Sequence, residues 1–169
     1  YALWQREVLG TEDDPESVAA QQVEYWKSAL SGLPDQLELP ADRPRPPMQS
    51  FRGAAVRFEI DPERHARLHE LARANNASLF MVVHAALAVL LARLSGTEDI
   101  AVGTPIAGRG ERELDDMIGM FVNTLVFRTQ VRPGDTFIDL LAEVRDRDLQ
   151  AFAHADVPFE RLVEVLNPV

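Results

Sequence analysis

Cysteine is absent from the 169-residue sequence. Disulfide bonds, catalysis by a thiolate and cysteine-ligated zinc are therefore excluded. The sequence also has no apolar run of the ~20 residues that a membrane-spanning helix requires. Its most apolar run, residues 79–91, includes His84 and is typical of a core helix. The first residues lack the basic and then apolar pattern of a secretory signal, so we expect a cytoplasmic protein.

Positive charge is also scarce. The 17 Lys and Arg residues are outnumbered by 27 Asp and Glu residues, which gives a net charge of −10 and a pI near 4.8. Such an acidic chain repels polyanions, which disfavours nucleic-acid binding and a general attraction to anionic membranes. Hydrophobic residues nevertheless form 46% of the chain, enough for a core in one domain or in one half of a larger one.

Helix signals recur along the chain. An N-capping Asp or Ser, a Pro at the first helical position and a terminal Gly are the usual marks of helix ends. Asp14 with Pro15, and Asp61 with Pro62, are predicted to begin helices in this way, and Ser78 begins a further one. The predicted helices cover residues 14–32, 61–76, 78–95, 135–155 and 157–166.

Strand signals are fewer. Alternation of apolar and polar residues predicts strands over residues 54–60, 98–106 and 118–131, and the second runs into a Gly-rich turn. Residues 33–53 are rich in proline and are predicted to be extended, without regular helix. Together these elements favour an α/β fold in which a small mixed sheet is packed with helices.

One amide interrupts an apolar strand face. In "IGMFVNTLVFR", residues 118–128, Asn123 shares a face with Phe121, Leu125 and Phe127, because strand side chains alternate. A buried amide without partners costs about 1–3 kcal/mol. Asn123 must therefore have hydrogen-bond partners or a functional role.

The turn "GTPIAGRG", residues 103–110, imitates a phosphate-binding loop. The signature requires Lys and then Ser or Thr after the second glycine, and Arg109 and Gly110 stand there instead. A turn that uses glycine for unusual backbone angles is the better interpretation.

The histidines give only weak indications of chemistry. His65 and His69 stand four residues apart, as zinc ligands on a helix do, but no further ligands cluster with them, and a solvated helix face is favoured. His84 is interpreted as a hydrogen-bonded core histidine, with a catalytic role as the alternative. His154 and Asp156 could form a polar pair at a helix junction, either for local capping or for acid–base chemistry.

Several stretches together resemble the condensation domains of nonribosomal peptide synthetases. "IGMFVNTLVFR" is similar to the fifth core motif of that family, and "HADVPFE" to the sixth, with Ala155 where Gln is usual. "YALWQ" resembles the end of the fourth motif. The stretches "LPADRPRP", "ASLFMVVHAALAVLL" and "GTPIAGR" are also similar to family segments, in the same order. The resemblance covers the whole chain.

The resemblance implies a fold and a reaction. Condensation domains have a chloramphenicol acetyltransferase-like fold of two similar halves, with the active site in a tunnel between them. There the amine of an acceptor aminoacyl thioester attacks a donor thioester. Both are carried on phosphopantetheine arms of peptidyl and aminoacyl carrier domains, so the resemblance implies no cofactor bound directly and no metal.

The family's catalytic histidine motif, H-H-x-x-x-D-G, is not found among the four histidines of this sequence. We therefore expect residues 1–169 to be the C-terminal half of a condensation domain, inactive without the N-terminal subdomain. An adenylation domain is the expected neighbour. A non-catalytic condensation-like module that recruits a partner protein is the alternative.

Site residues also follow from the resemblance. Asn123 is expected to line the tunnel, with Phe121, Gly119 and Thr124, and a satisfied structural amide bridging a loop is the alternative for Asn123. The expected subdomain interface consists of Arg109, Gly103, Pro105 and Met117. Arg109 would pair with the motif aspartate of the other half, or be a solvated turn arginine. Residues 110–120 would form a loop that crosses between the halves, and we expect the isolated chain to self-associate there.

Overall fold

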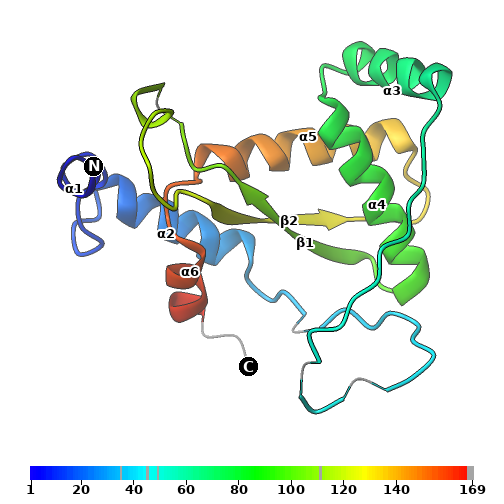
Figure 1. The fold of residues 1–169 in the computed structure, drawn as a ribbon, viewed down its shortest axis with the longest axis horizontal. Coiled ribbons are helices and arrows are strands. Elements are labelled where there is room, and N and C mark those ends of the chain that lie inside the picture. Colours follow the sequence, from blue (N-terminus) through cyan, green and yellow to red (C-terminus); the bar gives the residue numbers. More distant parts are fainter. Residues whose placement is uncertain (35, 45, 49, 111, 167–169) are drawn as a thin grey trace.

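A computed structural model describes residues 1–166 except 35, 45, 49 and 111. The described chain consists of helices packed around a two-stranded sheet, together with long connecting segments (Figure 1). Its elements, in order, are α1 (Ala2–Leu9), α2 (Val18–Ala29), α3 (Pro62–Ala74), α4 (Leu79–Ser95), β1 (Asp99–Ile106), the short 3-10 helix η1 (Arg112–Leu114), β2 (Asn123–Gln130), α5 (Phe137–Ala153) and α6 (Phe159–Leu166).

Local capping sets most helix boundaries. Asp61 caps α3 with Pro62 in its first turn, Ser78 caps α4, and Gly96 ends α4 in the left-handed conformation at φ 71°, as the sequence predicts. The prediction that Asp14 caps the second helix is wrong. Ser17 is the cap there, because its hydroxyl accepts from the amide of Ala20 while donating to the carbonyl of Thr11.

The sheet is smaller than the sequence suggests. β1 and β2 pair in antiparallel register, from Asp99 opposite Gln130 to Ile106 opposite Asn123, so the sheet of the described chain is antiparallel rather than mixed. The strand predicted over residues 54–60 is wrong, since this segment is exposed and pairs with no described residue. Alternation indicates which side chains would share a face, but a strand also needs a partner edge.

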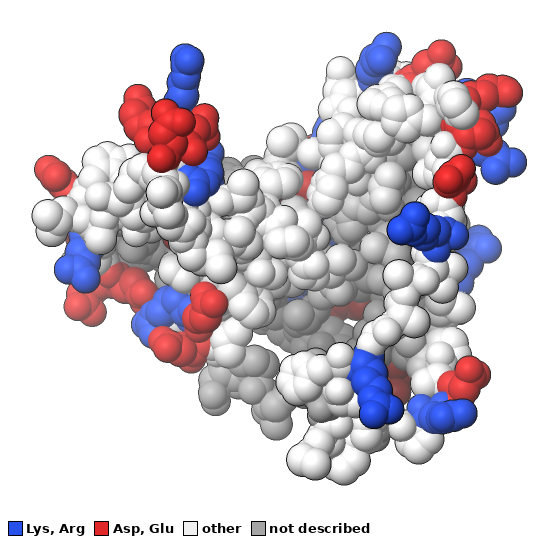
Figure 2. All heavy atoms as spheres, viewed as in Figure 1, with Lys and Arg blue, Asp and Glu red and all other residues white. Residues whose placement is uncertain are grey.

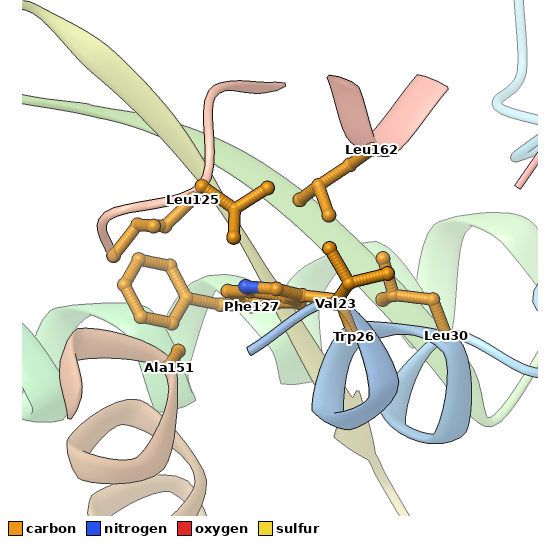
Figure 3. Packing of buried hydrophobic residues seen from close by; sticks show 8 residues of the cluster. Val23, Trp26, Leu30, Leu125, Phe127, Ala151 and Leu162 are labelled. Carbon is orange, nitrogen blue, oxygen red and sulfur yellow. The ribbon is translucent and has the colours of Figure 1, made fainter. Parts of the chain in front are cut away.

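The first buried cluster joins β2 to three helices. Figure 3 shows Trp26 and its α2 neighbours facing Leu125 and Phe127 of β2. The indole of Trp26 is 1% exposed, and its nitrogen donates to the carbonyl of His154 at 2.8 Å. The cluster consists of Val23, Trp26, Leu30, Leu125, Phe127, Ala151, Val157 and Leu162. These contacts fix the start of α6 against the beginning of β2.

The second buried cluster lies between α3, α4 and α5. Its members are mostly aliphatic, which suits close helix packing. They are Ala72, Met81, Val82, Ala85, Leu140, Leu141 and Val144. α4 and α5 thereby pack together, and both also contact the sheet.

The proline-rich region, predicted to be extended over residues 33–53, forms part of a long excursion from α2 to α3 (Figure 1). Its described residues form neither helix nor strand, and most of them are exposed. Parts of the prediction fall on residues 35, 45 and 49, which lie outside the described residues.

None of the helices that the structure describes is by itself long and apolar enough to cross a membrane. Only when α3 and α4 are taken together do they reach the length and apolar composition of a membrane span, and the two helices are bent by 101° relative to each other.

Candidate functional site

Asn123 is the first residue of β2, and its side chain fastens the start of α6. The amide nitrogen donates to the carbonyls of Ala155 and Val157, both at 2.9 Å. The amide oxygen accepts from the backbone N–H of Thr124 at 2.8 Å and of Phe159 at 3.0 Å. Both N–H groups and both lone pairs are therefore satisfied within the chain.

This geometry explains why an apolar strand carries an amide. Asn123 bridges the strand to the "HADVPFE" segment, which supplies three of its partners from 32 to 36 residues away. The arrangement corresponds to the structural alternative for Asn123. Its exposure to a substrate tunnel stays a prediction.

The "HADVPFE" segment is fastened to α2 as well. Gln22 is buried and exchanges two hydrogen bonds with Asp156: it donates to the carboxylate at 2.8 Å and accepts from the backbone N–H at 3.0 Å. His154 stacks on Tyr25 with 3.8 Å between the ring centroids, and its Nδ1 lies 2.7 Å from the carbonyl of Gln150. Burial raises the pKa of the Tyr25 phenol. His154 and Asp156 thus take different partners at the junction.

Arg109 holds the loop of residues 110–120. Its guanidinium donates to the carbonyl of Leu114 and, at 2.9 Å, to that of Met117. It also lies 4.2 Å from the ring centroid of Phe121. Arg109 therefore has a structural function within this chain, and its ion pair with another half of the domain stays a prediction.

A glycine allows the turn to pass close to the backbone of Phe121. Gly108 has a φ of 65°, and a Cβ placed on it would lie 1.7 Å from the carbonyl oxygen of Phe121. No L-residue fits at that distance, so the Gly-rich turn serves close backbone packing. It leads into η1 rather than a long helix, which agrees with a turn and not with a phosphate-binding loop.

A surface hollow of about 540 Å³ brings some of the predicted residues together. Asn123, Phe121 and Arg109 all line it, with Tyr1 of the N-terminal residues and Phe152 of α5. The ring of Tyr1 meets Phe121 edge to face at 5.0 Å. No helix is predicted from the sequence over residues 2–9, and the contact of Tyr1 with Phe121 shows how the start of α1 completes the wall of the hollow.

The other predicted residues lie around the hollow rather than in its lining. Met117 lines a neighbouring hollow of about 460 Å³ with Tyr1 and Trp4. Pro105 of β1 stands opposite Thr124 in the sheet register. A Cβ on Gly103 would contact the Thr124 methyl at 3.6 Å, and one on Gly119 would meet the Phe121 ring at 3.0 Å.

The loop of residues 110–120 presents apolar side chains to solvent. Ile118 is fully exposed and Met120 is 87% exposed, beside the acidic side chains that gather on this loop (Figure 2). β2 begins only at Asn123, so residues 118–122 of the predicted strand do not belong to it. Glu111, which is part of the expected crossing loop, lies outside the described residues.

A buried polar network was missed by sequence reasoning. His84 of α4 contacts Asp148 of α5 at 3.1 Å through Nδ1, and Nε2 lies 3.4 Å from the hydroxyl of Thr129 in β2. His84 is thus the hydrogen-bonded core histidine that its setting predicts. Its partners lie 64 and 45 residues away, where no local pattern could identify them.

His65 and His69 lie ring against ring on α3, with 4.5 Å between centroids at 78°. Across the part of the chain that the structure describes, no group of three or more His, Asp or Glu side chains is placed to hold a metal ion.

Comparisons with known proteins agree on one family. The model of the family described as "Condensation domain" matches residues 1–168. The Dimodular nonribosomal peptide synthase of Bacillus subtilis (strain 168) is 55% identical over 168 residues, which is 99% of this chain and 7% of that protein. This chain therefore spans only a small part of such relatives.

Solved structures give the same result for the fold. The complex of the X-domain and OxyB from teicoplanin biosynthesis matches with a TM-score of 0.91 and 34% identity, over 100% of this chain and 37% of that one. Holo-AB3403, a four-domain nonribosomal peptide synthetase bound to AMP and glycine, matches with a TM-score of 0.86 and 29% identity, over 93% of this chain and 12% of that one. The predicted chloramphenicol acetyltransferase-like α/β fold is confirmed.

Proposed function

The chain belongs to the condensation-domain family, and on that premise we propose that it forms part of an amide-bond-forming acyltransferase. The match over residues 1–168, together with 55% identity to a peptide synthase, carries this proposal. In the proposed reaction, an acceptor amine attacks a donor thioester carbonyl. The new C–N bond forms as the C–S bond breaks, the thiol leaves, and the amine gives up a proton.

In the proposed reaction, a histidine outside this chain transfers the proton. The motif H-H-x-x-x-D-G does not occur in the 169 residues, and His84 is buried against Asp148. Residues 1–169 would be the C-terminal subdomain, whose contribution is a wall beside the reacting groups. We expect the isolated chain to form no amide bond.

The hollow beside β2 is the proposed tunnel wall. Asn123, Phe121, Gly119 and Thr124 would lie along the substrate path, and Asn123 would act by holding the wall in place, since its own hydrogen bonds are internal. The proposed subdomain interface consists of Arg109, Gly103, Pro105 and Met117. The exposed apolar side chains of Ile118 and Met120 support an interface on the adjacent loop.

The proposed partners are those that such a reaction requires. Peptidyl and aminoacyl carrier domains would bring the donor and acceptor on phosphopantetheine arms, and an adenylation domain would be the neighbour that supplies activated amino acids. The four-domain synthetase among the structural relatives supports such an arrangement. A cytoplasmic location belongs to the same proposal.

Recruitment of another protein is the second candidate function. The X-domain, which matches with a TM-score of 0.91, is solved as a complex with OxyB. A module of this fold can therefore present a surface to a protein partner. For this chain, the recruitment function would use the same exposed surfaces without any amide-bond formation.

Reconstitution separates the two functions. A polypeptide carrying the H-H-x-x-x-D-G motif would be fused to, or co-expressed with, this chain and supplied with loaded donor and acceptor carrier domains. Mass spectrometry should detect the amide product only when both parts are present. Carrier binding without product, from folded and assembled protein, would contradict the catalytic function and favour recruitment.

A further inference from the structure

One wall of the hollow beside β2 is held by side chains from two different elements. Ala155 and Asp156 both line the hollow. Asn123 of β2 donates to the carbonyls of Ala155 and Val157, one on each side of Asp156. Gln22 of α2 holds Asp156 itself, through its carboxylate at 2.8 Å and its backbone N–H at 3.0 Å. These three successive residues are therefore fixed from β2 and from α2 together.

Gln22 is an unusual residue for its place in α2. Its side chain is 4% exposed, on the buried face of the helix that also carries Val23 and Trp26. Glutamine is mostly found on protein surfaces, and burial of an amide is unfavourable unless its donor and its acceptor both find partners. Both partners of Gln22 belong to Asp156, which lies 134 residues away. The amide is thus specific for this one residue of the wall.

The same face of α2 holds the residue at the start of the wall. Tyr25 and Trp26 follow Gln22 by three and four positions, so the three side chains are neighbours on the helix. The Trp26 indole donates to the carbonyl of His154 at 2.8 Å, and the Tyr25 ring stacks on the His154 ring. Since α2 holds both His154 and Asp156, its position is transmitted directly to the wall.

We propose that Gln22 is a positioning residue for amide-bond formation. It does not line the hollow. It acts through Asp156, which it fixes to α2 while Asn123 fixes the two flanking residues to β2. The inference rests on the proposed function of the hollow as a tunnel wall. A displacement of about 1 Å at a substrate-positioning wall can lower the rate of a reaction by up to about 100-fold.

An exchange of donor and acceptor tests the pair. Gln22→Glu replaces the donor by a buried carboxylate, which faces the Asp156 carboxylate where the 2.8 Å hydrogen bond was. When Gln22→Glu is combined with Asp156→Asn, the new amide donates to the new carboxylate, and the N–H of residue 156 still finds an acceptor. Asp156→Asn alone keeps both hydrogen bonds, because its amide oxygen accepts from Gln22.

The reconstituted domain, supplied with loaded carrier domains, gives the kinetic readout. Gln22→Glu should lower kcat for amide formation by about tenfold or more, for protein shown to be folded by circular dichroism. The combined variant should return kcat to the value of Asp156→Asn alone, which accounts for any direct effect of the Asp156 side chain. Gln21→Glu, on the exposed face of α2, adds the same charge and is the matched control.

Hydrogen exchange on the 169-residue chain gives a second readout that requires no reaction. The backbone N–H of Phe159 donates to Asn123 at 3.0 Å, three residues beyond Asp156. Gln22→Glu should make exchange of this N–H about tenfold faster, since the wall can then open locally. The N–H of Leu141, buried in α5, should be unaffected. A general loss of stability would instead accelerate both.

Gln22→Met removes both hydrogen bonds without adding a charge, and it provides the same comparisons if Gln22→Glu does not fold. Three results would overturn the proposal: unchanged protection of the Phe159 N–H, a combined variant no better than Gln22→Glu, or a fall in kcat that only follows the folded fraction. A wild-type domain that forms no amide would count against the proposed function, and hydrogen exchange would then decide whether Gln22 positions the wall.

Discussion

Residues 54–60 and residues 123–130 both alternate in polarity, but only the second segment is a strand. β2 pairs along its length with β1, and its apolar face covers Trp26 and the rest of the first cluster. Residues 54–60 pair with no strand in the described part of the chain, and they are exposed. Alternation thus predicts a face, whereas pairing and burial produce the strand.

The largest expected effect compares a phenylalanine in each segment. Phe127→Ala should lower the free energy of unfolding by about 3–5 kcal/mol, because its ring is 2% exposed and leaves a cavity. Phe58→Ala should change it by less than about 0.5 kcal/mol in dilute protein. Urea denaturation of both variants at low concentration provides the measurement. A similar loss in both would mean that residues 54–60 are buried in solution.

Substitution of Asn123, the first residue of β2, tests how much the start of this strand depends on side-chain hydrogen bonds. Asn123→Ala should destabilise the chain by about 2 kcal/mol, because two carbonyls and two N–H groups lose their partner. In limited proteolysis of this variant, the chain should be cleaved near α6 before it is cleaved elsewhere. Gln21→Ala on the exposed surface of α2 is a matched amide control. In a reconstituted domain, condensation falling far more than stability would instead indicate a direct role at the tunnel.

The other end of the β1–β2 sheet, near Asp99, is expected to make a pH-dependent contribution to stability. Arg128 donates to Asp99 at 2.9 and 2.7 Å and also to the carbonyls of Ala29 and Ser31. The hydrogen bond from Arg128 lowers the pKa of the Asp99 carboxyl. The pair therefore stabilises the fold above the unfolded pKa of about 3.9, and this contribution is lost as the pH falls through the lower folded pKa.

Asp99→Asn should accordingly cost about 1–2 kcal/mol at pH 7 and progressively less below about pH 4. Urea denaturation at a series of pH values measures the difference between the variant and the wild type. A difference that stays constant down to pH 2 would show that the ion pair is not the source.

The smallest expected effect concerns the loop before β2. Arg109→Lys keeps the charge but loses the forked hydrogen bonds to Leu114 and Met117, so global stability should change by less than about 1 kcal/mol. Hydrogen exchange in residues 112–120 should nevertheless become faster. Arg112→Lys, also in the loop, is the control. Unchanged exchange in the Arg109 variant would mean that Gly108 packing alone fixes the loop.

Local signals were predictable from the sequence, and long-range partners were not. Asp61, Ser78 and Gly96 set helix ends through bonds to residues a few positions away, which a short pattern contains. The partners of Asn123 and His84 lie on other elements, brought close only by tertiary packing. The sequence identified both side chains as requiring partners, but the fold was needed to supply them.

The same distinction applies to the candidate site. The family motifs identified Asn123, Phe121 and Arg109, which the structure brings to one hollow. The participation of Tyr1 and Phe152 could not be predicted, because it depends on where α1 begins and where α5 ends. Residues 54–60 do not form a strand in this structure. Their alternating pattern could not predict this, because it says nothing about whether a neighbouring strand is available for pairing.

The clamp at Asn123 also has a mechanical consequence. Its bonds to Ala155, Val157 and Phe159 are spread over the backbone just before and at the start of α6. A pulling force that reaches the domain through α6 would load these bonds together rather than one after another. Tension from that side would therefore be borne at the first residue of β2, before it reaches the rest of the sheet.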